Sequence, residues 1–308
     1  MTRTRRDHHG RVTRRVLVSA LAVLLAACTS TATTKGTARS TAASAAPSHS
    51  VASVASGQVP RFAHIVVVVE ENHAYSEVIG SANAPYVNTL ARSGTLLTNA
   101  YGVTHPSEPN YLALFSGSTH GLHDDSCPHR YAGGNLAAQL IAHGQTFAAY
   151  SESLPRTGYT GCSAGAYARK HAPWTDFSSA PAAVSRPMSG FPTDYRSLPR
   201  VSFVVPNLNH DMHDGTVRQG DDWLRSHLSG YVSWARSHDS LLIVTWDEDD
   251  NNDNNQIPTI ISGQKVVAGN YSEKITHYSV LRTLQDAFGL TPNDGSAIAS
   301  PITDIWAR

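Results

Sequence analysis

The sequence predicts an α/β fold, a three-layer α/β/α sandwich around a mostly parallel central sheet, and three observations support this prediction. Continuous β-branched runs such as His64 to Val69 are typical of strands buried on both faces of a parallel sheet. Segments with helical spacing, such as Ala84 to Ser93, alternate with these runs along the chain. Polar clusters follow three of the strands, and ligands bind beyond the carboxyl ends of strands in such sheets. We therefore expect these clusters to converge on one site.

The individual elements follow from apolar spacing and from the residues that end each segment. Gly94 stops the first long helix, and a proline occupies an early helical position before the apolar segment at 111–115. Residues 153–197 are rich in Gly, Pro, Ser and aromatic residues, which predicts a long loop near the site. In order, we expect strand 64–69, helix 84–93, strand 95–101, a loop at 104–110 that leads into a helix, helix 136–143, strand 146–151, strand 201–205, helix 217–237, strand 240–246, strand 257–261 and helix 277–288.

The N-terminus, residues 1–28, predicts export from the cytoplasm. An arginine-rich start precedes twelve apolar residues, Val16 to Ala27, which is too short to span a bilayer and suits a signal peptide. Leu25-Ala26-Ala27-Cys28 resembles a bacterial lipobox, which implies cleavage before Cys28 and lipidation of its sulfur. A soluble signal peptide with an incidental cysteine is the alternative. Arg14-Arg15 also suggests the twin-arginine route, and the general secretory route is the alternative.

Residues 29–60 are rich in Ser, Thr and Ala, which predicts a disordered tether because too little apolar surface is available to offset the ordering entropy. We expect the protein on the outer face of the cytoplasmic membrane, held there through the lipid anchor only, or secreted. The remaining residues, 61–308, suit one domain, which we expect to be a monomer. A formal net charge of zero excludes the basic surplus that nucleic acid binding needs.

Two further cysteines, Cys127 and Cys162, lie in segments rich in Gly, Ser and Pro. An exported protein meets an oxidising compartment, so this pair predicts a disulfide. Two buried free thiols, or a zinc site built on these cysteines, are the alternatives.

Carboxylates follow the strands at 64–69 and 240–246. Glu70-Glu71-Asn72 ends the first, and Asp247-Glu248-Asp249-Asp250 ends the other. Adjacent carboxylates repel each other unless a cation lies between them, and oxygen ligands of this kind suit a divalent metal ion. The alternatives are a solvated strand end for the first cluster and, for the second, an acidic loop or a surface calcium loop that includes Asp253.

A serine and several histidines complete the candidate chemistry. Ser107 lies near a helix N-terminus, where backbone N–H groups favour an anion, and a metal ion could deprotonate its hydroxyl. Its alternative is an ordinary helix cap. Two histidines and two aspartates lie at 210–214 and fit a zinc-type or phosphate-contacting site, or a polar loop. His277 opens a helix and could be a ligand, a general acid or a capping residue.

Taken together, these segments resemble one family. The segment 105–117, His-Pro-Ser-Glu-Pro-Asn-Tyr-Leu-Ala-Leu-Phe-Ser-Gly, is similar to the nucleophile segment of the bacterial phosphoesterase family. That family contains acid phosphatases and phosphatidylcholine-type phospholipases C and belongs to the alkaline-phosphatase-like superfamily. The resemblance covers residues 61–308, and the other matching segments follow in the same order: Glu70-Glu71-Asn72, Asp211-Met212-His213-Asp214-Gly215, Trp246-Asp247-Glu248-Asp249-Asp250 and Thr276-His277-Tyr278.

The resemblance implies a role for each matching residue. Ser107 would be the nucleophile, and His213 or His277 would protonate the leaving oxygen. Substrate contacts would come from His105, Asn110, Asp211 and Asp214, whereas His210 is not required by the family pattern. One divalent metal ion, calcium, magnesium, manganese or zinc, would be held by Glu71, Asn72, Ser107, Asp247 and Glu248. Asp211, His213 and His277 supply only part of the ligand set for a second metal.

The expected function is that of an acid phosphatase that hydrolyses phosphomonoesters. Phosphoinositides such as phosphatidylinositol 3-phosphate, nucleotides and sugar phosphates are the candidate substrates. A phospholipase C is the alternative enzyme, which we favour less because we identify no added C-terminal lipid-docking domain. A solute-binding lipoprotein is the non-enzymatic alternative, suggested by the anchor and the tether.

Overall fold

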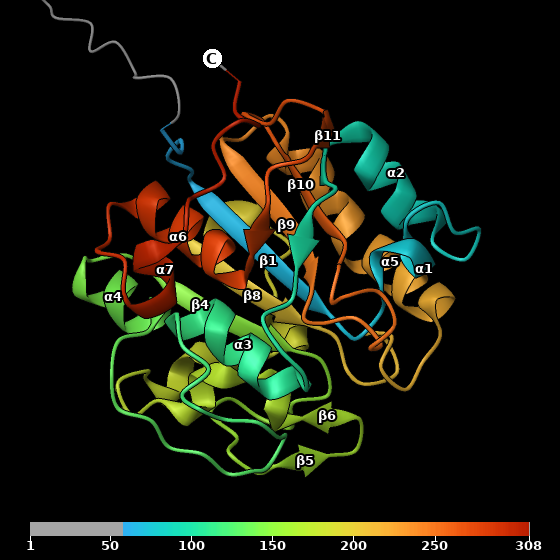
Figure 1. Ribbon diagram of the computed structural model, residues 1–308. Coiled ribbons are helices and arrows are strands. Elements are labelled where there is room, and N and C mark those ends of the chain that lie inside the picture. The colour runs from blue at the N-terminus through green and yellow to red at the C-terminus, as the bar shows by residue number, and fades with distance from the viewer. Residues whose placement is uncertain (1–57, 308) are drawn as a thin grey trace, which may run out of the picture. The chain divides into compact units, whose positions relative to one another are not determined.

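The computed structural model describes residues 58–307, so the predicted signal peptide, the lipidation site Cys28 and nearly all of the tether lie outside the described residues. Within 58–307, no helix is both long enough and apolar enough to span a membrane. An eight-stranded sheet lies at the centre of this region (Figure 1). Its strands, in spatial order, are β11 (Gly269–Tyr271), β2 (Thr95–Leu97), β10 (Thr259–Gly263), β9 (Ser240–Trp246), β1 (His64–Glu70), β8 (Val201–Val205), β4 (Phe147–Ser151) and β7 (Ser185–Pro187).

The predicted mostly parallel sheet is confirmed. β1 pairs in parallel with β8 on one side, where Ile65 faces Val201, and with β9 on the other, where Ile65 faces Leu241. Only β10, among the described strands of this sheet, runs antiparallel to its neighbours. The β-branched residues of β1 are at most 1% exposed, as expected for a strand covered on both faces. The carboxyl ends of β1 and β9 consequently lie side by side.

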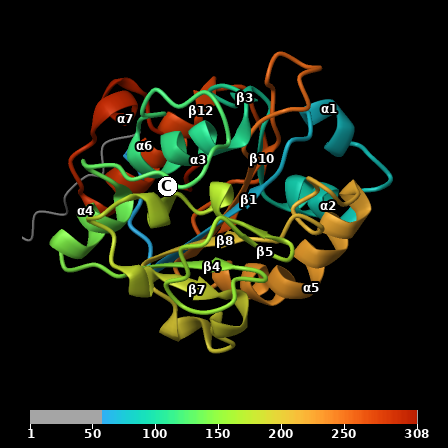
Figure 2. The same cartoon turned by 90° about the horizontal axis from the view of Figure 1, so that it is seen from below.

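Helices cover both faces of the sheet, which confirms the three-layer sandwich (Figures 1 and 2). On one face α2 (Pro85–Ser93) packs against α5 (Val217–Ala235). The other face carries α3 (Ser107–Ser116), α4 (Leu136–Ala142), α6 (His277–Phe288) and α7 (Asp294–Ile298). The short helix α1 (Tyr75–Val78) follows the polar end of β1.

Two predicted strands differ from the structure. The expected strand 95–101 is two strands, because β3 (Ala100–Tyr101) leaves the central sheet and pairs with β12 (Ile275–Thr276). The strand expected at 257–261 is β10, which begins two residues later. Pro258 has no N–H to donate, and the Ile257 N–H bonds outside the sheet to the Ala100 carbonyl, 3.0 Å away.

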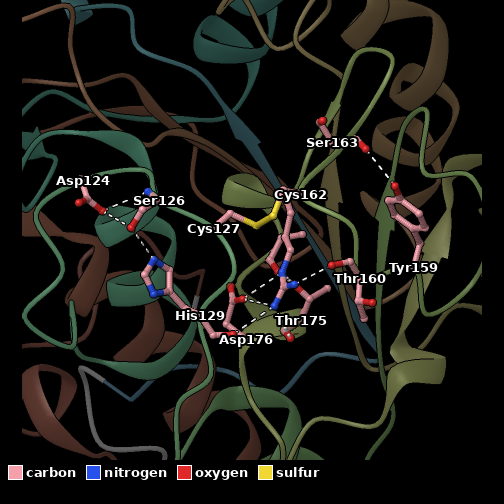
Figure 3. The surroundings of a disulfide bond; sticks show 12 residues. Asp124, Ser126, Cys127, His129, Tyr159, Thr160, Cys162, Ser163, Thr175 and Asp176 are labelled. Atoms are coloured by element: carbon pink, nitrogen blue, oxygen red, sulfur yellow. Dashed lines mark hydrogen bonds and ion pairs between the residues drawn. A yellow bond between two sulfur atoms is a disulfide. The ribbon is translucent and has the colours of Figure 1, made fainter.

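The long segment 153–197 is more structured than the predicted loop. It contains a small hairpin, β5 (Ser163–Ala164) and β6 (Tyr167–Ala168), and its strand β7 adds to the edge of the central sheet. Short 3₁₀ turns occupy much of the rest: Arg169–His171, Pro173–Asp176, Ala182–Val184, Met188–Gly190 and Tyr195–Ser197. Cys127 and Cys162, the expected pair, form a disulfide with an S–S distance of 2.14 Å, which joins this segment to the loop that follows α3 (Figure 3).

Candidate active site

Ser107 is the first residue of α3, and its side chain lies between two carboxylates. The preceding Pro106 has extended backbone and so marks the start of the helix. The Ser107 hydroxyl donates to Glu71 Oε2 at 2.9 Å and also lies 3.4 Å from Glu248 Oε1. Ser107 is only 1% exposed. A serine hydroxyl that donates to a buried carboxylate has an acceptor for its proton already in place.

The carboxylates come from the ends of the adjacent strands β1 and β9. Because the Asp247 N–H bonds to the Glu70 carbonyl at 3.0 Å, the two strand ends are held in register. Asp247 Oδ1 accepts from the backbone N–H groups of Asn72, at 3.1 Å, and of Glu248, at 2.7 Å. Asp247 Oδ2 is buried and has no hydrogen-bond partner. The sheet therefore brings the Glu71 and Glu248 carboxylates to Ser107, and Asp247 bonds the backbone of Asn72 and Glu248 at the same strand ends.

Mutual repulsion and burial shift the pKa values of these carboxyl groups. Burial, reinforced by the charges of Glu71 and Glu248, raises the pKa of Asp247 well above its usual range. Burial and the Glu71 charge likewise raise the pKa of Glu248 to about 8. Neighbouring buried carboxyl groups with pKa values shifted in this way are common where a cation or a reacting group binds.

His171, which the sequence analysis did not single out, lies against the same cluster. Its Nε2 lies 2.8 Å from Glu71 Oε1, and its Nδ1 lies 3.3 Å from Asp211 Oδ2. The imidazole stacks on the Tyr111 ring of α3, with 5.0 Å between ring centroids. Burial alone would lower the pKa of His171, but the Glu71 charge and the hydrogen bonds to both carboxylates raise it to about 9. The resulting imidazolium in turn lowers the pKa of Glu71, against the effect of burial.

Asp125 and Lys170, which the sequence did not indicate as site residues either, lie at the N-terminus of α3. Asp125 Oδ1 accepts from the Glu108 N–H at 2.9 Å, so a carboxylate occupies part of the position where the sequence predicts an anion. Lys170 Nζ donates to Asp125 Oδ2 at 3.0 Å and to His213 Nε2 at 3.2 Å. The other ring nitrogen of His213 lies 2.8 Å from Asp214 Oδ1. This half-exposed row of side chains, Asp125, Lys170, His213 and Asp214, forms one rim of the site.

His105 and Asn110, both expected to contact substrate, make hydrogen bonds or ion pairs with other groups of the protein. His105 lies 2.9 Å from Glu248 Oε2 and 3.1 Å from Asp249 Oδ1. The amide of Asn110 accepts from the Val103 and Thr104 N–H groups and donates to the Thr104 and Pro106 carbonyls. Its Nδ2 also lies 3.2 Å from Glu248 Oε2. Asn110 therefore shapes the loop before Ser107 and orients Glu248.

His277 lies behind Asp247 rather than on the rim. Its Nε2 donates to the Asp247 carbonyl at 2.6 Å, and the residue is 1% exposed. Burial lowers the pKa of His277 to about 4, so the imidazole is neutral above that pH. With its N–H committed to a backbone carbonyl, His277 is placed as a support for Asp247.

Two remaining groups lie away from Ser107. His210 Nδ1 turns to Glu152, 2.9 Å away. Asp249 accepts the backbone N–H groups of Asn251, Asp253 and Asn255, so its carboxylate organises the acidic loop itself. Lys170 and His171 come just after the short strand β6, and Asp125 lies in the loop after α3, so none of the three follows a strand of the central sheet. No periodic pattern in the sequence marks these three residues. Only their chemistry and their proximity in sequence to the two cysteines could have indicated them.

The family match and the curated relatives show that the chain is a phosphoric ester hydrolase. The fold is that of the alkaline phosphatase superfamily, since the structure superposes on a member of that superfamily from Vibrio parahaemolyticus with a TM-score of 0.55, at 12% identity over 80% of this chain and 72% of that one. The phosphonate monoester hydrolase from Silicibacter pomeroyi gives a TM-score of 0.54, at 10% identity over 78% and 75%. The phosphoesterase family model matches residues 81–291, and the chain belongs to that family.

Curated relatives are similar in sequence as well. The phosphatidylinositol-3-phosphatase of Mycobacterium tuberculosis is 51% identical over 258 residues, which cover 82% of this chain and 86% of the relative. The acid phosphatase of Aspergillus fumigatus is 29% identical over 79% of this chain and 58% of the fungal protein. A phosphate-repressible acid phosphatase of Penicillium chrysogenum is 30% identical over 66% and 54%. The chain thus spans little more than half the length of these two fungal relatives.

Proposed function

We propose that the chain is an exported phosphomonoesterase whose nucleophile is Ser107, and that phosphatidylinositol 3-phosphate is among its substrates. The observation that carries the proposal is the Ser107 hydroxyl at the N-terminus of α3, 2.9 Å from Glu71 and 3.4 Å from Glu248. The substrate is suggested by the mycobacterial relative, a phosphatidylinositol-3-phosphatase. Export rests on residues 1–28, which lie outside the described residues.

We further propose that one divalent cation binds among Glu71, Asn72, Ser107, Asp247 and Glu248. The donor set fits such an ion, because Asp247 Oδ2 is buried without a hydrogen-bond partner and two carboxylates, those of Glu71 and Glu248, lie within 3.4 Å of the Ser107 hydroxyl. Among residues 58–307, no three His, Cys, Asp or Glu side chains form a ready-made cage, so the carboxylates would reorient around the ion. Oxygen ligands suit calcium, magnesium or manganese, and the nearby histidines admit zinc. When bound, a divalent cation supplies electrostatic activation of the hydroxyl and of the phosphoryl group.

The residues of the chain perform the remaining steps. Ser107 Oγ attacks phosphorus in line while its proton passes to the Glu71 carboxylate, which forms a phosphoserine and displaces the alcohol oxygen. His213, on the rim, donates a proton to that leaving oxygen in its imidazolium form, in which Nε2 no longer accepts from Lys170. The Glu108 N–H and Lys170 stabilise negative charge on the equatorial oxygens once Asp125 gives way to the substrate. Water then attacks the phosphoserine, and release of phosphate restores the serine hydroxyl.

The nucleophile is tested with Ser107→Ala and a matched control. Ser116→Ala removes a hydroxyl from the last residue of the same helix, where it is buried and donates to the Leu112 carbonyl. On an aryl phosphate, we expect Ser107→Ala to lower kcat by roughly a thousand-fold or more, and Ser116→Ala to retain it. A Ser107→Ala protein with near wild-type turnover would end the proposal.

The substrate class is tested on vesicles. Release of phosphate from phosphatidylinositol 3-phosphate supports the phosphomonoesterase. Release of diacylglycerol from phosphatidylcholine would instead support a phospholipase C, and tight binding of phosphate esters without turnover would support a solute-binding protein. Metal analysis of the purified protein, followed by turnover with and without chelator, tests the cation.

A further inference from the structure

Arg169 is a buried arginine whose guanidinium ties three separate chain segments together. Nη1 donates to the Thr160 carbonyl at 2.6 Å, and Nη2 donates to the His129 carbonyl at 3.2 Å. Nη2 also donates to Asp176 Oδ1 at 2.6 Å, and Nε lies 2.9 Å from Thr175 Oγ1. The side chain is 7% exposed, and its Asp176 partner is 1% exposed. Every nitrogen of the guanidinium therefore makes at least one hydrogen bond.

The Cys127–Cys162 disulfide joins two of the same segments. Cys127 lies two residues before His129, and Cys162 lies two residues after Thr160 (Figure 3). The Arg169 N–H also donates to the Cys162 carbonyl at 3.0 Å. The Tyr131 N–H donates to the Asp176 carbonyl at 2.6 Å, which joins the segment after Cys127 to the segment that contains Asp176. The disulfide, Arg169 and Asp176 thus form one cross-linked unit, which we call the Arg169 knot.

The Arg169 knot lies directly next to the candidate active site. Arg169 opens the 3₁₀ turn Arg169–His171, and the next two residues are the missed site residues. Lys170 reaches Asp125 at 3.0 Å, and His171 reaches Glu71 at 2.8 Å. Asp125 itself lies two residues before Cys127, in a segment that the knot holds in place. The cross-linked 3₁₀ turn and loop therefore carry three charged side chains of the site, Asp125, Lys170 and His171.

We propose that Arg169 is a positioning residue for catalysis, acting with the disulfide to hold Lys170 and His171 in the site. The proposal rests on the proposed function, since it concerns the turnover that Ser107 performs. Lysine cannot replace arginine here, because an ammonium group lacks the planar fork that reaches the His129 and Thr160 carbonyls together. Loss of the fork releases the turn that carries Lys170 and His171, while the disulfide and the core keep the protein folded.

The test compares Arg169→Lys with Arg200→Lys. Arg200 is a matched control because it also donates from Nη1 to a backbone carbonyl, that of Ala63, and from Nε to Gln145, both at 3.1 Å. It makes these contacts at the amino-terminal end of β1, on the edge of the sheet opposite to Ser107. The free energy of unfolding, kcat, KM and amide hydrogen exchange of residues 169–172 are measured for both variants. Wild type is measured with and without a thiol reductant.

Under conditions where all the proteins are folded, we expect Arg169→Lys to lower kcat by roughly ten- to a hundred-fold. We expect faster exchange at 169–172 in this variant. Arg200→Lys should keep kcat within about twofold and leave exchange of that peptide unchanged. Reduction of the disulfide in wild type should lower kcat and speed the same exchange.

An Arg169→Lys protein with the kcat of Arg200→Lys overturns the proposal, whatever its stability, and so does unchanged exchange at 169–172. Full turnover after reduction of the disulfide would show that the disulfide does not help to position the site residues, and would overturn the proposal that Arg169 acts together with it. Ser107→Ala provides the baseline that separates the two proposals. If wild type is no faster than Ser107→Ala, the proposed function fails, and the exchange of 169–172 still decides whether Arg169 positions this segment.

Discussion

Replacement of His277 by phenylalanine separates a supporting role from an acid–base role. Phenylalanine keeps a ring of similar size, so little cavity is created, but the 2.6 Å hydrogen bond from Nε2 to the Asp247 carbonyl is lost. A buried acceptor left without its donor costs about 1–3 kcal/mol in the free energy of unfolding. Because the Asp247 carboxylate then loses its fixed backbone, we expect apparent metal affinity to fall by roughly ten- to a hundred-fold.

The assay measures kcat/KM of His277→Phe on an aryl phosphate over a range of divalent cation concentrations and pH. We expect high concentrations of the proposed divalent cation to restore most of the turnover. The pH profile should keep its shape, because a group with a pKa of about 4 is already neutral over the working range. His213→Gln should instead remove the limb of the profile that reports protonation of the leaving group.

The reasoning is refuted if His277→Phe loses more than about a thousand-fold in turnover that no cation concentration restores. A loss of that size is the range expected for removal of a general acid. A variant with unchanged stability would also contradict it, since the hydrogen bond to the Asp247 carbonyl would then contribute nothing.

Three other predictions concern groups around the site and in the fold. Asp125→Asn removes the carboxylate that accepts from the Glu108 N–H, so inorganic phosphate should inhibit the variant at lower concentration than wild type, as measured by Ki. Asp221→Ala removes a side chain of α5 that accepts from two N–H groups in the first turn of α2, at 2.7 and 3.1 Å, and should lower the free energy of unfolding by about 1–2 kcal/mol in a denaturant titration. Burial, opposed by Arg169, raises the pKa of Asp176 to about 6 in the folded protein, from about 3.8 in the unfolded chain. The protonated Asp176 side chain therefore stabilises the fold fully below about pH 3.8, and this contribution is lost as the pH rises through about 6. The difference in unfolding free energy between wild type and Asp176→Asn should therefore change by up to about 3 kcal/mol between pH 4 and 7, and a constant difference would contradict this assignment.

The sheet and its polar edge were predictable because both depend on local patterns. A β-branched run such as that of β1 indicates a buried strand, and parallel strands place their carboxyl ends at one edge. Glu71 and Glu248 were therefore expected together, although they lie far apart in the chain. The late start of β10 has a single local cause, because Pro258 has no N–H to donate to the ladder.

The sequence by itself determined the α/β architecture, the family and the candidate nucleophile Ser107, since these depend on periodicity and on continuous segments. Tertiary structure alone decided which side chains meet around that serine. Asp125, Lys170 and His171 come from loops whose positions depend on the Arg169 knot, and no periodic pattern encodes such cross-links. The direction of His277 was likewise decided by packing, because its buried ring at the start of α6 points Nε2 toward the Asp247 carbonyl.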